Sequence, residues 1–88
     1  MSFQIQFVPA AIRQLEKLPR RDQHRIRDAI EELAKEPRPQ NVKKMVGSDN
    51  LWRLRVSNYR VLYEIHDARL VVLVIRIAHR KDIYRKGG

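Results

Sequence analysis

The hydrophobic residues of this chain change their spacing near residue 51, and this change constrains the fold more than any other feature. Between residues 12 and 34, apolar side chains recur every three or four residues, as in an amphipathic helix. The clearest such stripe consists of Ile26, Ala29, Ile30, Leu33 and Ala34. After residue 51 the period becomes two, which is typical of half-buried strands. Helical periodicity followed by consecutive strands predicts an α+β fold.

Turn and breaker residues divide these patterns into six elements. Residues 3–7 alternate as a first strand, and Pro9 suits the first turn of a helix that is interrupted at Pro19. A second helix ends before two further prolines, and the polar segment 40–50 is predicted to be a loop with room for a short strand. Three strands follow, over residues 51–56, 59–66 and 70–78. The predicted order is β-α-α-β-β-β, with two helices packed on one face of a four-stranded, largely antiparallel sheet.

The first two of these last strands form a hairpin whose register can be predicted. Only Ser57 and Asn58 separate them, and a two-residue loop fixes which residues lie opposite each other. One face of the hairpin is apolar and should pack under the helices. The predicted cross-strand pairs are Val56 with Tyr59, Arg55 with Arg60, and Arg53 with Leu62.

Five arginines are predicted to share the face that the helices leave open: Arg53, Arg55, Arg60, Arg76 and Arg80. A three-residue turn at 67–69 would pair His66 with Leu70 and set Arg60 opposite Arg76. Like charges opposite one another destabilise a sheet. The guanidinium fork matches phosphate oxygens. The cluster therefore indicates an anionic ligand.

The net charge also favours a polyanionic partner. Nineteen Lys and Arg oppose ten Asp and Glu, which gives a net charge of +9 and an isoelectric point near 10.7. For so basic a chain, nucleic acid is the most common partner, and an acidic protein or an anionic membrane comes next. The alternative is a solvated face on which Glu64 and Asp82 pair with some of the arginines.

Several other classes of protein are disfavoured. The chain has no cysteine, so disulfides and cysteine-ligated metals are excluded. Its longest apolar run, Leu70–Ile75, is far shorter than a bilayer span. The first residues lack the basic and apolar regions of a signal peptide. We therefore expect a cytoplasmic protein without a membrane partner.

Two C-terminal motifs resemble a known family. The stretch from Trp52 to Tyr63 is similar to the central hairpin of the RelE/ParE toxin superfamily, and the stretch from Ala78 to Arg85 is similar to the ending of its RelE-type members. The resemblance covers essentially the whole chain and implies a single RelE-like toxin domain over residues 1–88. It further implies an endoribonuclease of a type II toxin–antitoxin system that enters the ribosomal A site, cuts mRNA, and is neutralised by an antitoxin.

The resemblance also implies a site. RelE-type toxins carry basic residues on the hairpin, an arginine that ends the last strand and a nearby tyrosine. The matching candidate catalytic residues are Arg53, Arg60, Arg80 and Tyr84. The candidate RNA-binding residues are Arg55, Arg76, Lys43, Lys44 and Lys81. This chain departs from the pattern at Leu51, where some relatives have a further lysine.

These residues suit cleavage without a metal or other cofactor, by attack of the 2′-hydroxyl on the adjacent phosphate. In this hypothesis Arg53 and Arg60 contact the phosphate, and Arg80 stabilises or protonates the leaving oxygen. Tyr84 stacks on a base or orients the 2′-hydroxyl. The general base stays open, because arginine remains protonated and strand parity turns His79 toward the helices.

Two other functions are compatible with the same fold. Toxins of the ParE branch bind DNA gyrase and cut nothing, and a plain RNA-binding module is a third possibility. Apolar residues are also expected on the open face or its edge, where an antitoxin segment or self-association would cover them. These residues are Leu51, Leu62, Leu70, Val72 and Val74.

Overall fold

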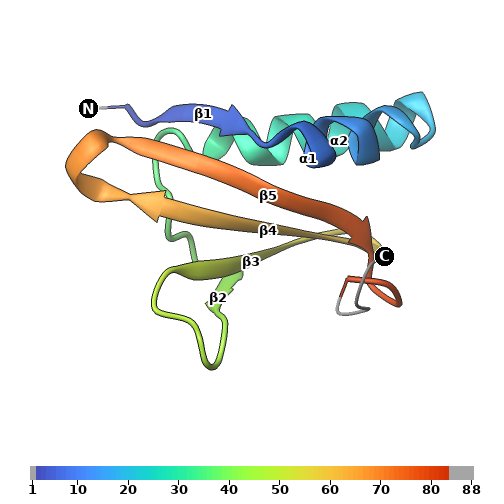
Figure 1. Ribbon diagram of the computed structural model, residues 1–88. Coiled ribbons are helices and arrows are strands. Elements are labelled where there is room, and N and C mark those ends of the chain that lie inside the picture. The colour runs from blue at the N-terminus through green and yellow to red at the C-terminus, as the bar shows by residue number, and fades with distance from the viewer. Residues whose placement is uncertain (1, 84–88) are drawn as a thin grey trace.

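The computed structural model describes residues 2–83 and places five strands in one sheet, in the order β1-β5-β4-β3-β2 (Figure 1). β1 runs parallel to β5, and every other neighbouring pair is antiparallel. The elements are β1 (Gln4–Phe7), α1 (Pro9–Glu16), α2 (Arg20–Glu32), β2 (Val42–Lys44), β3 (Leu51–Val56), β4 (Tyr59–His66), a 3₁₀ turn (Asp67–Arg69) and β5 (Val71–His79).

This arrangement confirms the predicted α+β architecture and corrects its strand count from four to five. The additional strand, β2, lies inside the segment predicted to be mainly loop and pairs with β3. It spans three residues, two of them lysines, so it carries no hydrophobic alternation by which the sequence could reveal it.

Two short helices cover one face of the sheet. Pro9 occupies the first turn of α1, where its missing N–H is not needed. The chain breaks at Pro19, which precedes α2. α1 packs against β1 and β5, and α2 packs against β3. Both helices lie on the same side of the sheet in Figure 1, whereas the turn after β5 lies on the other side.

The core lies between these helices and the sheet. Its fully buried members include Ile26 and Ile30 of α2, Val61 of β4, and Val72 and Val74 of β5. Trp52, Tyr59 and Tyr63 also belong to this side of the sheet, as the hairpin parity predicts. The tyrosines find polar partners there: the Tyr63 hydroxyl donates to the Pro37 carbonyl oxygen at 2.6 Å, and the Tyr59 hydroxyl donates to Asp22 at 2.9 Å.

The register of β3 with β4 is the predicted one, but that of β4 with β5 is not. Leu70 adopts a left-handed conformation, with φ 53°, and ends the turn one residue later than predicted, so that His66 pairs with Val71. An irregularity between Leu62 and Tyr63 then shifts the register again. As a result Arg60 lies opposite Ala78, and the predicted pairing of Arg60 with Arg76 is wrong.

The two shifts also correct the predicted apolar surface. Val72 and Val74 pair with Ile65 and Tyr63 in the core, so their predicted place on the open face is wrong. Beyond the irregularity the two shifts add up to two residues, so the side chains of β5 again lie on the faces predicted for them. Arg76 therefore does share the open face with Leu62, its cross-strand neighbour.

We predict that Tyr63→Phe lowers the free energy of unfolding by about 1–3 kcal/mol at neutral pH, because the buried Pro37 carbonyl would lose its donor. Burial raises the pKa of Tyr63 above its unfolded value. The native state therefore retains the phenol proton more tightly, and stability must fall as the pH rises above about 10. Chemical denaturation at pH 7 and at several pH values above 10 should show a shallower alkaline decline in the variant. Identical stability and pH profiles would contradict this role.

Candidate nucleic-acid interface

Basic residues from four neighbouring strands form two cross-strand rows on the face away from the helices. The first row consists of Lys43, Arg53, Leu62 and Arg76, from β2, β3, β4 and β5. The second consists of Arg55, Arg60 and Ala78. The residues that alternate with them, such as Leu54 and Val61, are buried in the core. We call the surface formed by Lys43, Arg53, Arg55, Arg60 and Arg76 the basic face.

One of the two predicted acidic neighbours, Glu64, has a histidine as its partner in the structure. Glu64 lies 2.9 Å from His66 on the same strand and forms an ion pair when that histidine is protonated. A salt bridge joins Arg38 to Asp67, which lie outside the two rows. Arg55 is exposed and directly opposite Arg60. Like charges so placed repel each other, which an anion between them would relieve.

The hairpin turn between β3 and β4 brings two candidate catalytic residues together. The Arg60 guanidinium donates from Nη1 to the Ser57 and Tyr59 carbonyl oxygens, at 3.1 and 2.8 Å. The backbone N–H of Arg80 donates to the Asn58 carbonyl oxygen at 2.7 Å. Arg60 and Arg80 therefore adjoin the same two-residue turn, although 20 positions separate them in sequence.

Arg76 contacts the turn that follows β5. Its Nη2 donates to the Asp82 carbonyl oxygen at 2.9 Å, which fixes that turn on the side of the basic face. Ile83, in the same turn, is 2% exposed. Leu62, the cross-strand neighbour of Arg76, is 8% exposed although it lies on the side away from the helices. Part of this face is thus covered within the chain itself.

The remaining predicted contacts are not all on one surface. Lys43 extends the first row, whereas Lys44 pairs with Trp52, so the pleat turns it to the opposite side at the sheet edge. Lys81 lies in the turn after β5, and its N–H donates to His79 Nδ1 at 3.2 Å. Tyr84 lies outside the described residues. The structure therefore brings together Lys43, Arg53, Arg55 and Arg60. Arg80 lies next to the turn that joins β3 to β4.

His79 and His66, whose imidazoles could in principle accept a proton, both lie outside the basic face. His79 pairs with Tyr59 on the helix side, and their rings contact edge to face with centroids 5.9 Å apart. This confirms the predicted orientation of His79. His66 ends β4 and is bonded to Glu64. Neither imidazole belongs to the two basic rows.

Two further polar residues, which the sequence did not single out, border the basic face. Gln40 and Asn41 line a hollow of about 220 Å³ together with Val42, Lys43, Arg53 and Arg55. Because β2 is short and polar, its pairing with β3 was not predicted, and nothing else in the sequence brings these amides near the arginines. We call this feature the amide hollow.

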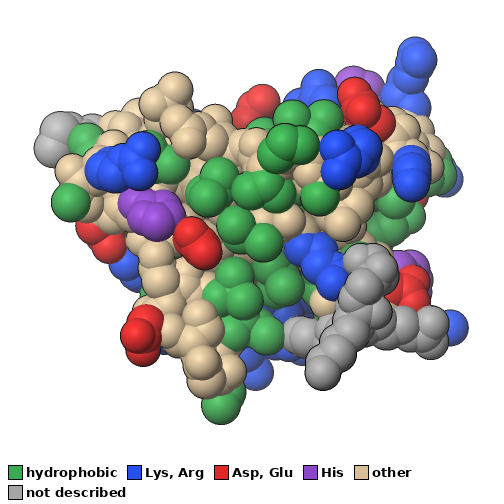
Figure 2. Space-filling view, viewed as in Figure 1, with side chains coloured by type: hydrophobic (Ala, Val, Ile, Leu, Met, Phe, Trp, Pro, Cys, Tyr) green, Lys and Arg blue, Asp and Glu red, His purple; other side chains and the backbone are tan. Residues whose placement is uncertain are grey.

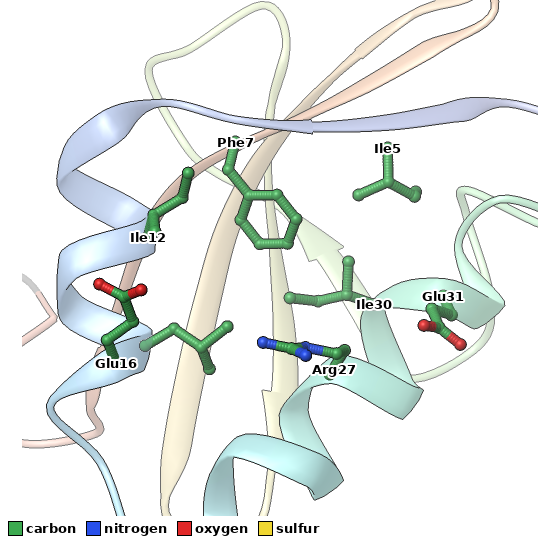
Figure 3. Close-up of a pocket in the computed structure, with 8 residues that line it drawn as sticks. Ile5, Phe7, Ile12, Glu16, Arg27, Ile30 and Glu31 are labelled. Carbon is green, nitrogen blue, oxygen red and sulfur yellow. The ribbon is translucent and has the colours of Figure 1, made fainter.

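An apolar groove of about 340 Å³ lies on another part of the molecule, where α1, α2 and β1 meet (Figure 3). Its apolar walls come from Ile5, Phe7, Ile12, Leu15 and Ile30, and its charged rim from Glu16, Arg27 and Glu31. Ile12 is 43% exposed. Figure 2 shows apolar side chains gathered across the middle of the molecule in this view, with charged side chains around them.

Comparison with known proteins places this arrangement in a family. A family described as the ParE toxin of type II toxin–antitoxin system, parDE, matches residues 5–84. The chain belongs to the RelE/ParE toxin superfamily. Toxin RelG of Mycobacterium tuberculosis is 33% identical to it over 91 residues, with 98% of this chain and all of RelG covered. Such similarity makes the protein a RelE-family toxin of a type II toxin–antitoxin system.

Solved structures agree with the RelE fold of this toxin. The archaeal RelE–RelB complex of Pyrococcus horikoshii contains a chain that superposes with a TM-score of 0.82, at 24% identity, covering 93% of this chain and 99% of that one. The RelBE2 toxin–antitoxin complex of Mycobacterium tuberculosis gives a TM-score of 0.78 at 29% identity, covering 91% and 100%. Among residues 2–83 of the toxin, no helix has the length and apolar character to cross a membrane.

We predict that Arg76→Ala loosens the turn after β5 without unfolding the toxin. The substitution removes the donor to the Asp82 carbonyl oxygen, so amide hydrogen exchange over residues 80–83 should accelerate by about fivefold or more. Arg55→Ala is the matched control, because it removes an exposed arginine from the same face. Equal exchange in both variants would show that Arg76 does not hold the turn.

Proposed function

We propose that this toxin is an endoribonuclease that enters the ribosomal A site and cuts mRNA there. The proposal is supported by the placement of Arg53, Arg55 and Arg60 on one face of two adjacent strands, with the backbone of Arg80 bonded to the turn that joins these strands. Guanidinium groups bind phosphate oxygens in bidentate fashion and stay charged at cellular pH. A compact group of such cations suits the binding of one backbone phosphate better than positive charge spread over the whole surface would.

The reaction proposed is an intramolecular transfer. The 2′-oxygen of one nucleotide forms a bond to the adjacent phosphorus while the bond from phosphorus to the 5′-oxygen breaks. The 2′-hydroxyl proton passes to a base and a proton reaches the leaving 5′-oxygen, which yields a 2′,3′-cyclic phosphate and a 5′-hydroxyl. This balance requires neither metal nor redox cofactor.

The described residues suit separate parts of this reaction. Arg53 and Arg60 would contact the phosphate oxygens, where negative charge increases in the transition state. Arg60 is well placed for this because two carbonyl oxygens already orient its guanidinium. Arg80 would stabilise or protonate the leaving oxygen, and Arg55 and Lys43 would contact flanking phosphates. Tyr84 is proposed to stack on a base or orient the 2′-hydroxyl.

The partners proposed are mRNA, ribosomal RNA at the A site, and a cognate antitoxin, all in the cytoplasm. Two solved relatives are complexes of a RelE-type toxin with its antitoxin. The net charge of +9 favours both polyanionic RNA and an acidic antitoxin segment. Lys44 and Lys81 would contribute charge to docking on RNA, since such contacts need no specific geometry.

A second candidate function is inhibition of DNA gyrase, because the family that matches residues 5–84 is described as the ParE toxin. That activity requires no arginines gathered around a phosphate. The RelG relative and the basic face favour the RNA-cutting function instead.

We predict that Arg60→Ala and Arg80→Ala each reduce mRNA cleavage by about 100-fold or more, because each removes a cation from the transition state. Cells expressing each variant would be examined by mapping mRNA 5′ ends on translating ribosomes. Arg13→Ala is the matched control, since it removes one positive charge from α1 and leaves the basic face intact. Circular dichroism would establish that all variants are folded.

The control should produce the same new 5′ ends within A-site codons as the unmodified toxin. DNA breaks without mRNA cuts would instead favour gyrase inhibition. Unchanged cleavage by both the Arg60 and Arg80 variants would overturn the proposed roles.

A further inference from the structure

The amide hollow opens onto the basic face at the β2 edge of the sheet. Val42 pairs with Leu54, so Asn41, one residue earlier, lies beside Arg55. Arg53 and Arg55 border both the hollow and the proposed phosphate site. An RNA strand whose phosphate is held by these arginines would therefore bring a neighbouring nucleotide to the hollow.

The two amides give the hollow hydrogen-bonding groups that the rest of the basic face lacks. A side-chain amide carries both a donor and an acceptor and has no charge. Such pairs match the edges of nucleobases, whereas phosphate recognition needs only donors and positive charge. Gln40 and Asn41 are exposed, and within residues 2–83 their amides make no hydrogen bond. Val42 adds an apolar wall.

The turn that carries the two amides is held in place from several sides. Arg38 donates to both carboxylate oxygens of Asp67, at 3.1 and 2.7 Å, and its guanidinium lies 5.2 Å from the centre of the Trp52 ring. The arginine lowers the pKa of Asp67 and so keeps this carboxylate ionised. The Tyr63 hydroxyl donates to the Pro37 carbonyl oxygen on the same segment. Amides on an anchored turn lose little freedom when they bind.

We propose that the amide hollow binds the nucleobase of the mRNA nucleotide next to the scissile phosphate, and that Gln40 and Asn41 determine which base is preferred there. This inference rests on the proposed ribonuclease function and adds a base-selective site to it. The arginines hold the backbone, and the amides hydrogen-bond the edge of a base that is unstacked in single-stranded mRNA.

The test compares the sequences at mRNA cleavage sites for the unmodified toxin, Gln40→Ala and Asn41→Ala. The matched control is Gln4→Ala, which removes an exposed amide from β1, at the opposite edge of the sheet. For the unmodified toxin and the control, the nucleotide beside the cut should show the same base preference. In at least one of the two hollow variants that preference should fall by about tenfold.

A uniform loss of cleavage at all sites, with the base preference unchanged, would show that the amides dock on ribosomal RNA or only support the turn, and would overturn the inference. Absence of cleavage by the unmodified toxin would overturn the proposed function instead. A binding measurement that needs no cleavage separates these failures. In the Arg80→Ala background, hexaribonucleotides of A, C, G and U should bind with unequal affinities, and Gln40→Ala together with Asn41→Ala should equalise them. Equal affinities before that change would refute the base-selective site.

Discussion

The β3–β4 hairpin holds Arg55 and Arg60 directly opposite each other, and the candidate site depends on this cross-strand pairing. The two-residue turn fixes the pairing. The buried side chains of Leu54, Val56 and Val61 fix it again, because a slip of one residue would expose them to water. Core burial therefore maintains a like-charge contact that the sheet alone would disfavour. An anionic ligand would relieve this repulsion, so the stability of the core is linked to the proposed phosphate site.

The end of the chain is attached to this hairpin by polar contacts. The Arg80 N–H reaches the Asn58 carbonyl oxygen in the hairpin turn, and Arg76 reaches the Asp82 carbonyl oxygen in the turn after β5. Arg76, which holds a turn through its side chain, and Arg80, the proposed catalytic residue, are thus only four positions apart but make different contacts. At the other edge of the sheet, Arg38 is engaged with Asp67 and Trp52. Arg38 and Arg76 therefore fasten turns, whereas Arg55 is exposed on the basic face.

The register of the hairpin, and the face on which its arginines lie, could be predicted because loop length and strand parity determine both. The sequence did not predict the register of β5, which depends on the left-handed conformation of Leu70 and on an irregularity in the β4–β5 pairing. At Arg76 the two shifts add up to two residues, so its face was predicted correctly although its cross-strand partner was not. Val72 and Val74 lie where only the first shift applies, which places them in the core. The amide hollow was missed because a three-residue polar strand has no recognisable period.

The claim that the basic face binds one backbone phosphate of mRNA is tested most directly by the structure of the Arg80→Ala toxin on a translating ribosome, determined by cryo-electron microscopy. We expect an A-site mRNA phosphate with its oxygens about 3 Å from guanidinium nitrogens of Arg53 and Arg60. A bound toxin whose basic face contacts only ribosomal protein or RNA, with the mRNA phosphates elsewhere, would contradict it.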